Sequence, residues 1–346
     1  MNSPRQVKLN DRLFCQIEIR DPLICELIDS RAFQRLKGVN QYGGVNFVYP
    51  DRYQVSRYEH SIGVWYVLRS LGVDLEVQVA GLLHDIGHTA FSHMVDQALE
   101  SESEDFHEQH MHLIPGIEEL NAFLAGEGII LRDLEDYSEI KTSLPAVGAD
   151  RLDYAMRDGI AARNLETDLG LRVLDSIELY DGKIVFTELG AAEAFAAMGL
   201  QSMWDVIYAP EVAVVYQALI ELLRTGLAEG WINHSDLYLE DAELFKILIS
   251  KREQLPELHC RIFEERFKVV PADNIDTADF THTKLKVRYF DPPVLIDGGL
   301  IPLSQLAPQF CDLLTEYRSK FSKRVHGESF NVVWLGSKSG KVARTK

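Results

Sequence analysis

Cysteine is scarce in this sequence, and long apolar runs are missing from it. The four cysteines, Cys15, Cys25, Cys260 and Cys311, are scattered, and no two of them have CxxC spacing. This excludes a zinc ribbon and a disulfide framework, so free thiols in a reducing cytosol are the simpler interpretation. No apolar run approaches the length of a membrane span, and residues 1–9 lack the pattern of a signal peptide. We therefore expect a cytoplasmic protein that makes no membrane contact.

Basic residues are also in short supply. The chain has 35 Lys and Arg against 53 Asp and Glu, which gives a formal net charge of −18 at pH 7. Long-range electrostatics therefore oppose binding to nucleic acid, and we do not expect it as a partner. A phosphate-bearing ligand would have to be held by local cations or by a metal ion. The 346 residues allow one large domain or two of ordinary size.

Internal repeats are absent, and the apolar pattern is mostly helical. The spacing predicts helices within 23–39, 57–71, 131–141, 189–203, 209–227, 235–250 (with Ser235 as its cap) and 306–321. Residues 45–49 are typical of a short extended segment, and alternation around Asp181-Gly182 predicts a hairpin over 176–187. From about Val269, short strand-like pieces appear. We expect a mainly α fold with a core over residues 1–230 and a helical and small-β region over 231–346.

One stretch combines apolar and metal-binding residue types. The apolar run Val77–Leu83 leads directly into His84-Asp85, and Gly87, His88 and His93 follow. An imidazole and a carboxylate at the buried end of a helix are costly unless they bind something, and a divalent metal is the simplest partner. A lone His-Asp pair would more often be a solvated helix end, so the interpretation depends on further ligands elsewhere in the chain.

Two other predicted helices supply such ligands. His60 shares a helix face with apolar residues four and eight positions later, so it should point inward. Asp150, Tyr154 and Asp158 form a second stripe at the same spacing. Such a stripe can be a solvated face, but the small and apolar residues before Asp150 favour a largely buried helix.

The order His60, His84-Asp85, Asp150 resembles the H…HD…D pattern of the HD-domain metal-dependent phosphohydrolases. Further segments resemble the deoxynucleoside triphosphate triphosphohydrolase branch of that superfamily, and no SAM domain is evident. The segments that carry this resemblance are Phe33–Leu36, Gln41 with Gly43-Gly44, Arg57–Ser61, His84–His88, Phe91–His93, His107–Gln109, Asp150–Tyr154, Arg157-Asp158 and Ile262–Pro271. The similarity spans most of residues 20–310.

The resemblance implies a role for each matching position. The implied ligands of one divalent metal ion (Mn, Fe, Mg, Co or Zn) are His60, His84, Asp85 and Asp150. The implied catalytic residues are His107, with His88 beside it, and the acidic residues Glu108 and Asp96 that orient it. The implied substrate contacts are Gln41, Arg57, His93, Arg151, Tyr154 and Asp158. Arg57 and Arg151 would hold phosphate oxygens, and Gln41, Tyr154 and Asp158 would contact the deoxyribose.

The implied reaction is hydrolysis of a deoxynucleoside triphosphate to a deoxynucleoside and inorganic triphosphate, by a homo-oligomer. The chain departs from the family pattern in one place. Relatives carry an Arg and a His that reach the phosphates where this chain has Tyr208–Val215, with an added Glu211. Two alternatives therefore stay open: a phosphohydrolase that acts on another nucleotide or phosphoester, and a non-catalytic nucleotide-binding regulator with a vestigial site.

Overall fold

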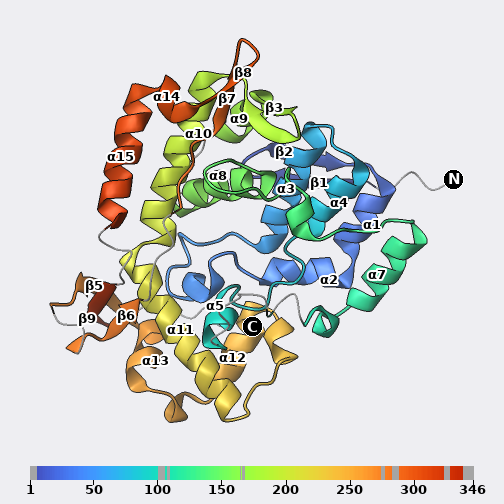
Figure 1. Cartoon of the computed structure of the whole chain (residues 1–346). Coiled ribbons are helices and arrows are strands. Elements are labelled where there is room, and N and C mark those ends of the chain that lie inside the picture. The colour runs from blue at the N-terminus through green and yellow to red at the C-terminus, as the bar shows by residue number, and fades with distance from the viewer. Residues whose placement is uncertain are drawn as a thin grey trace.

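The protein is built mainly from helices, with three small sheets at its edges (Figure 1). This computed structural model describes residues 6–99, 106, 110–163, 165, 168–273, 277–282, 288–322 and 328–337. The α-helices are α1 (Pro22–Asp29), α2 (Arg31–Gln34), α3 (Arg57–Ser70), α4 (Leu75–Leu83), α5 (Met94–Ala98), α7 (Ile117–Gly126), α8 (Ala149–Arg163), α9 (Leu169–Asp175), α10 (Leu189–Ser202), α11 (Pro210–Ala228), α12 (Asp241–Ile249), α13 (Glu257–Glu264), α14 (Leu303–Leu306) and α15 (Pro308–Ser322). A π-helical turn, η5 (Met203–Ile207), joins α10 to the bend before α11.

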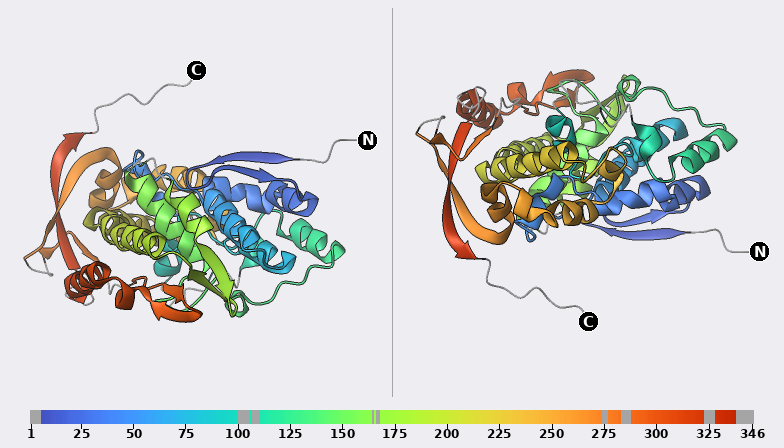
Figure 2. Two further views of the ribbon diagram at one scale, coloured as in Figure 1. Left: turned by 90° about the horizontal axis from the view of Figure 1, so that it is seen from above. Right: turned by 90° about the horizontal axis from the view of Figure 1, so that it is seen from below.

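The strands form three separate sheets. They are β1 (Val7–Asp11), β2 (Cys15–Ile19), β3 (Ile177–Tyr180), β4 (Lys183–Phe186), β5 (Glu265–Pro271), β6 (Phe280–His282), β7 (Pro293–Ile296), β8 (Gly299–Pro302) and β9 (Glu328–Ser337). The first sheet is the antiparallel hairpin β1–β2, the second has the order β3-β4-β7-β8, and the third has the order β5-β9-β6. Among the strands that the structure describes, only β4 and β7 run parallel, through the pair Phe186 and Val294. Figure 2 shows the N-terminal hairpin at one end of the molecule and β5 with β9 at the opposite end.

The core lies where α3, α4, α8 and α10 pack against one another. Its largest fully buried side chains include Trp65, Phe195 and Phe290. Helix α8 is buried along most of its length, as the sequence around Asp150 predicted, and this includes the charged residues Asp153 and Arg157. Charged side chains are rarely fully buried unless they are paired, so we expect Asp153 and Arg157 to have charged or hydrogen-bonding partners in the core.

Several predicted elements are confirmed. The helix expected within 23–39 forms as α1 and α2. They are separated at Ser30, whose hydroxyl caps the second helix by accepting from the backbone N–H of Phe33. The hairpin β3–β4 turns at Asp181 and Gly182, which both have a positive φ. That conformation is the one such a tight turn demands.

Other predicted elements are wrong. Residues 131–141 form only a short 3₁₀ turn (Leu134–Asp136), and Gly43–Phe47 is a 3₁₀ turn where an extended segment was expected. Ser235 is not the cap of α12, since its backbone N–H and its hydroxyl both donate to Asn233. The helix begins six residues later, with Glu240 as its cap. In each case, local turn hydrogen bonds replace the helix or strand that the apolar spacing indicated.

Among the described residues, no single helix is long and apolar enough to cross a membrane. The segments α10–η5 and α11, with a bend of 50° between them, reach the length and apolar composition of a membrane span only when they are taken together.

Candidate metal centre

His60 and Arg57 are placed by the first turns of α3. Ser56 and Glu59 form a reciprocal capping box at the start of this helix. The box fixes where the helix begins, and so which residues of its first turns face α8. His60 is 1% exposed and Arg57 is 5% exposed. The prediction that His60 points inward is therefore confirmed.

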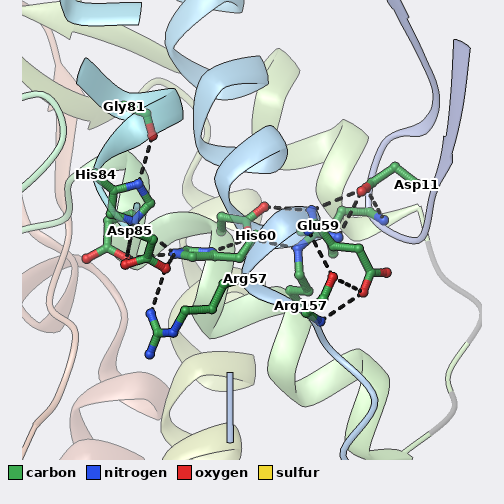
Figure 3. Close-up of polar contacts among 12 residues, drawn as sticks. Asp11, Arg57, Glu59, His60, Gly81, His84, Asp85 and Arg157 are labelled. Atoms are coloured by element: carbon green, nitrogen blue, oxygen red, sulfur yellow. Dashed lines mark hydrogen bonds and ion pairs between the residues drawn. The ribbon is translucent and has the colours of Figure 1, made fainter. Parts of the chain in front are cut away.

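His84 and Asp85 follow the end of α4. The helix ends at Leu83, with His84 as its C-cap, four residues before Gly87. A turn follows, in which the backbone N–H of His88 donates to the carbonyl oxygen of Asp85 at 3.1 Å. The tight turn points the side chains of His84 and Asp85 toward α3 (Figure 3).

Three ligand-type atoms from three helical elements converge at this point. The Nε2 atoms of His60 and His84 are 3.2 Å apart, and the Oδ1 atom of Asp150 lies 3.1 Å from the first and 3.8 Å from the second. One donor atom from each of these residues lies within 4.8 Å of the others. Two imidazole nitrogens and a carboxylate oxygen at this separation could hold a first-row divalent metal ion.

The other nitrogen of each imidazole is already engaged. His60 Nδ1 lies 2.8 Å from Asp153 Oδ1, and His84 Nδ1 lies 2.7 Å from the carbonyl oxygen of Gly81. A carbonyl oxygen only accepts a hydrogen bond, so His84 Nδ1 carries the proton. A carboxylate oxygen also accepts, so His60 Nδ1 carries a proton as well. A neutral ring with its proton on Nδ1 would present the Nε2 lone pair to a metal ion, as ligating histidines require.

Asp85 joins the cluster from its edge. Its Oδ1 lies 3.4 Å from His84 Nε2, and its Oδ2 lies 3.8 Å from His60 Nε2 and 2.6 Å from Arg57 Nη1. Burial raises the pKa of this carboxyl, but the charge of Arg57 above all, with the neighbouring rings of His84 and His88, outweighs burial and holds the pKa well below its usual value. Asp85 is therefore an anion at neutral pH and available as a fourth ligand.

The charges of the cluster fit a divalent cation. Four carboxylates and two guanidinium groups lie in this cluster: Arg57 pairs with Asp85, Arg157 pairs with Asp11 and Asp153, and Asp150 contacts His60. With neutral imidazoles this leaves two negative charges that the described residues do not neutralise. Burial lowers the pKa of His60, yet the hydrogen bonds that its ring donates to Asp150 and Asp153 raise it to about 10, so without a metal ion this ring holds a proton on Nε2 that a bound metal ion would displace. The site thus attracts positive charge to the position between these residues.

Two loops beside the cluster are held by residues whose roles the sequence did not reveal. Asp241 accepts from the backbone N–H groups of Asn40 and Phe91, both at 2.8 Å. Phe91 and Ser92 have φ values of 60° and 54°, a conformation that non-glycine residues adopt at a cost and that clusters at functional sites. Buried Arg35, which lies within the family-like segment Phe33–Leu36, donates to the carbonyl oxygens of Ile86 and His88 and so holds the turn after Asp85. A buried acidic residue 150 positions from Phe91 leaves no pattern in the sequence.

Of the two predicted phosphate contacts, Arg57 lies at the metal-ligand cluster and Arg151 is engaged with backbone carbonyl oxygens. Arg57 lies at the cluster, where its Nε donates to the Ser92 hydroxyl at 2.9 Å. Arg151 instead donates to the carbonyl oxygens of Thr142 and Ala146, at 3.0 and 2.6 Å. It would have to release these carbonyls, or use its remaining N–H groups, to reach a phosphate.

The predicted sugar contacts Gln41, Tyr154 and Asp158 are largely buried. Gln41 Oε1 and Asp158 Oδ1 are buried acceptors with no hydrogen-bond partner among the described residues. Burial raises the pKa of Asp158 to about 7, although the Tyr42 hydroxyl opposes the rise. Buried acceptors without donors are rare and costly in proteins. They suit a site that receives donors, such as hydroxyl groups, from a ligand.

The predicted acid–base residues can be placed only in part. His88 is buried, with Nε2 3.2 Å from Asp85 Oδ1, and burial with the nearby Arg57 charge holds its pKa well below the usual value. The half-exposed His93 packs edge to face on His88, and its Nδ1 lies 3.9 Å from buried Asp96. The two other residues predicted for catalysis, His107 and Glu108, lie outside the described residues.

Comparison with known proteins agrees with this geometry. The HD domain family model matches residues 57–155, which include all four predicted ligands. The chain is 33% identical over 303 residues to the uncharacterised protein YdhJ of Bacillus subtilis, covering 86% of this chain and 91% of YdhJ. It is 29% identical over 314 residues to the metal-dependent phosphohydrolase cns2 of Cordyceps militaris, covering 87% and 89% of the two chains. The chain belongs to the HD-domain family of metal-dependent phosphohydrolases.

Two further similarities concern a segment of the sequence and the overall fold. The chain is 40% identical over 111 residues to the deoxynucleoside triphosphate triphosphohydrolase SAMHD1 of Xenopus laevis, but this covers 28% of the chain and 17% of SAMHD1. The fold matches the crystal structure of a phosphohydrolase of Bacteroides thetaiotaomicron with a TM-score of 0.67 at 18% identity, over 94% of this chain and 98% of that one. The first concerns one segment of the chain, and the second shows the fold.

Proposed function

We propose that this HD-domain protein hydrolyses deoxynucleoside triphosphates to a deoxynucleoside and inorganic triphosphate, with one divalent metal ion held by His60, His84, Asp85 and Asp150. The observation that carries the proposal is the convergence of two Nε2 atoms and Asp150 Oδ1 within 4.8 Å. A bound metal ion would supply Lewis-acid activation of a phosphoryl oxygen and of water. Mn, Fe, Mg, Co and Zn all suit this ligand set.

In the proposed reaction, water attacks the α-phosphorus, the bond from that phosphorus to the 5′ oxygen breaks, and the deoxynucleoside leaves with a proton. Arg57 is placed to hold phosphate oxygens beside the ligands, because its ion pair with Asp85 fixes the guanidinium at the cluster. His88, His93 and Asp96 stand on the same side as Asp85, where a histidine could transfer a proton. His107 and Glu108 remain part of the proposed acid–base group.

The sugar is the part of the substrate that the buried acceptors favour. Gln41 Oε1 and Asp158 Oδ1 lack donors among the described side chains, and a deoxyribose 3′-hydroxyl carries one. Asp158, Tyr42 and Tyr216 are close enough that the charge of Asp158 acts on both phenols. Two phenol rings beside this carboxyl would suit a sugar without a 2′-hydroxyl. The partial similarity to SAMHD1 supports the same substrate class.

The triphosphate needs more positive charge than Arg57 alone provides, and the segment Tyr208–Val215 supplies none. Arg288 is the candidate for the additional positive charge. Burial raises the pKa of Tyr154 and of Tyr216 to about 12, and the charge of Arg288 opposes the rise at both. The charge of Arg288 therefore acts on both rings from the C-terminal region, which supports it as a phosphate contact. Its position is held by the Tyr317 hydroxyl, which donates to its carbonyl oxygen at 2.7 Å.

Product analysis tests the proposal. The purified chain is incubated with each dNTP and each NTP, with Mn²⁺ or Mg²⁺, and nucleoside, nucleotides, phosphate and triphosphate are separated. Release of nucleoside and triphosphate from dNTPs alone would support it. Asp85→Ala and Asp150→Ala should abolish turnover by removing ligands. The matched control is Asp175→Ala, which changes an exposed aspartate on α9 and should leave turnover unchanged.

The alternatives give different products. Phosphate released from another nucleotide or ester, without triphosphate, would keep the metal site and replace the substrate. Binding of a nucleotide without turnover under any metal would favour a non-catalytic regulator. A homo-oligomer in the cytoplasm completes the proposal, and light scattering of the purified chain tests the oligomeric state.

A further inference from the structure

A buried chain of polar contacts runs from the proposed metal site to the N-terminal hairpin (Figure 3). It starts at His60, whose Nδ1 donates to Asp153 Oδ1 at 2.8 Å. Arg157 then donates to both oxygens of Asp153, from Nε and Nη2, each at 2.8 Å. Its remaining terminal nitrogen, Nη1, donates to Asp11 Oδ2 at 2.8 Å. Asp11 is the last residue of β1.

The middle of this chain is shut off from solvent. The side chains of Asp153 and Arg157 are 0% exposed, and that of Asp11 is 6% exposed. Buried ion pairs of this kind are costly to form and costlier to break. Removing the charge of one residue in the chain therefore changes the strength of the remaining contacts in it. The space for it is provided by α3, where Gly63 faces the Asp153 carboxylate and the Arg157 guanidinium and no side chain would fit.

Asp11 is also fixed on its other side. Its Oδ1 accepts from the backbone N–H groups of Leu13 and Phe14 in the turn between β1 and β2, at 2.8 and 3.0 Å. Arg12, next to it, donates to Glu59, which belongs to the capping box of α3. The hairpin therefore contacts both helices that carry the ligands His60 and Asp150.

We propose that Asp11 is a positioning residue for the metal site and acts on His60 through Arg157 and Asp153. This inference rests on the proposed metal centre. Asp11 takes up part of the Arg157 charge, which leaves the Asp153 carboxylate free to accept strongly from His60 Nδ1. A stronger acceptor at Nδ1 makes His60 Nε2 a better metal ligand and fixes the ring orientation.

The sign of the effect follows from these charges. Without the Asp11 carboxylate, Arg157 bears wholly on Asp153, which weakens its hydrogen bond to His60. The less neutralised guanidinium also repels a dication. Both effects lower metal affinity. Partners in the second layer around a metal typically contribute 10- to 100-fold in affinity, and Asp11 stands two contacts further out than Asp153. We therefore expect about a 3- to 10-fold loss for Asp11 and more for Asp153.

The test is calorimetric titration of Mn²⁺ into the full chain after removal of bound metal. Asp11→Asn and Asp11→Ser both keep an acceptor for the turn amides and remove the charge that faces Arg157, and both should bind Mn²⁺ about 3- to 10-fold more weakly than the wild type. Gln16→Ala changes an exposed residue of the same hairpin and is the matched control, with affinity unchanged. Thermal unfolding identifies the folded fraction, so that affinity is compared only among folded proteins.

The outcomes separate this inference from the proposed function. If the wild type does not bind Mn²⁺, or if Asp150→Ala binds it equally well, the metal centre itself is refuted. If the wild type binds and both Asp11 variants bind with wild-type affinity, the metal centre stands and the role of Asp11 is refuted. A purely structural hairpin would lower the unfolding temperature of these variants without changing the Mn²⁺ affinity of the folded protein.

Discussion

Arg57 and Asp85 form a buried ion pair, with Nη1 and Oδ2 2.6 Å apart. Asp85 is a proposed metal ligand and Arg57 a proposed phosphate contact, so one interaction joins the two halves of the site. The same guanidinium donates through Nε to Ser92, whose hydroxyl donates in turn to the carbonyl oxygen of Asn40 at 2.8 Å. The proposed metal ligand, the proposed phosphate contact and the loop before Gln41 are therefore held as one unit.

Substitution of Arg57 should affect both stability and turnover. Arg57→Ala leaves the Asp85 charge buried and unpaired, which is expected to lower the free energy of unfolding by about 3–5 kcal/mol. Arg57→Lys keeps the charge but loses the planar fork that bonds Asp85 and Ser92 together. We expect it to fold and to lose about 100-fold in kcat/KM. Urea unfolding and steady-state kinetics measure the two effects.

The control for Arg57 is Arg69→Lys, at an exposed position of the same helix, which should change neither quantity. Wild-type kcat/KM in a folded Arg57→Lys protein would show that the fork has no part in substrate binding.

Gly63→Ala should disrupt the protein where α3 meets α8. A methyl group at this position would overlap the Asp153 carboxylate and the Arg157 guanidinium, both of which are fully buried. Overpacking typically costs about 1–3 kcal/mol, and displaced ion pairs add to it. We expect a lower unfolding free energy and weaker Mn²⁺ binding, measured by urea unfolding and calorimetry.

Gly126→Ala is the matched control for Gly63. It lies in the last turn of α7, and nothing stands within 4 Å of the added methyl group. Alanine favours a helix over glycine by about 1 kcal/mol. This variant should therefore be as stable as the wild type or slightly more so, with the same Mn²⁺ affinity. Equal behaviour of the two variants would mean that the space at Gly63 is not needed.

Asp241 should make stability depend on pH. Burial raises its pKa to about 7, and its hydrogen bonds from Phe91 and Asn40 only partly oppose the rise. The folded state therefore keeps a proton that the unfolded state releases near pH 4. The resulting stabilisation is complete below that pH and is lost as pH rises toward 7. Between pH 5 and 7 the wild type should lose about 2 kcal/mol relative to Asp241→Asn, which cannot titrate.

Urea unfolding of both proteins at pH 5, 6, 7 and 8 measures this difference. It should level off above pH 7. A difference that does not change with pH would show that Asp241 is ionised throughout, with the two amide donors fully compensating its burial.

The proposed ligands could be found in the sequence because each sits at a regular position of a helix or directly after one. His60 shares the apolar face of α3, and the apolar run of α4 leads into His84-Asp85. The residues that support them could not be found in this way. Asp11, Arg157 and Asp241 act across 146 to 201 positions of the chain, and a tertiary contact of that kind has no periodicity. The helix predicted at 131–141 was wrong for a different reason. There the sequence does show a helical apolar pattern, but local turn hydrogen bonds form in place of the helix.

Arg288 should set the affinity for the triphosphate without contributing to the metal site. Its charge acts on Tyr154 and Tyr216, on the side of the site where Tyr208–Val215 offers no cation. Arg288→Ala should raise KM for dNTPs by about tenfold, the effect of losing one charge-assisted hydrogen bond of roughly 1.5 kcal/mol. Its kcat and its Mn²⁺ affinity should stay near wild-type values. Arg266→Ala, at an exposed position of β5, removes the same charge away from the site and should change nothing. If Arg288→Ala leaves KM unchanged, the triphosphate is held by Arg57 and the metal ion without help from the C-terminal region.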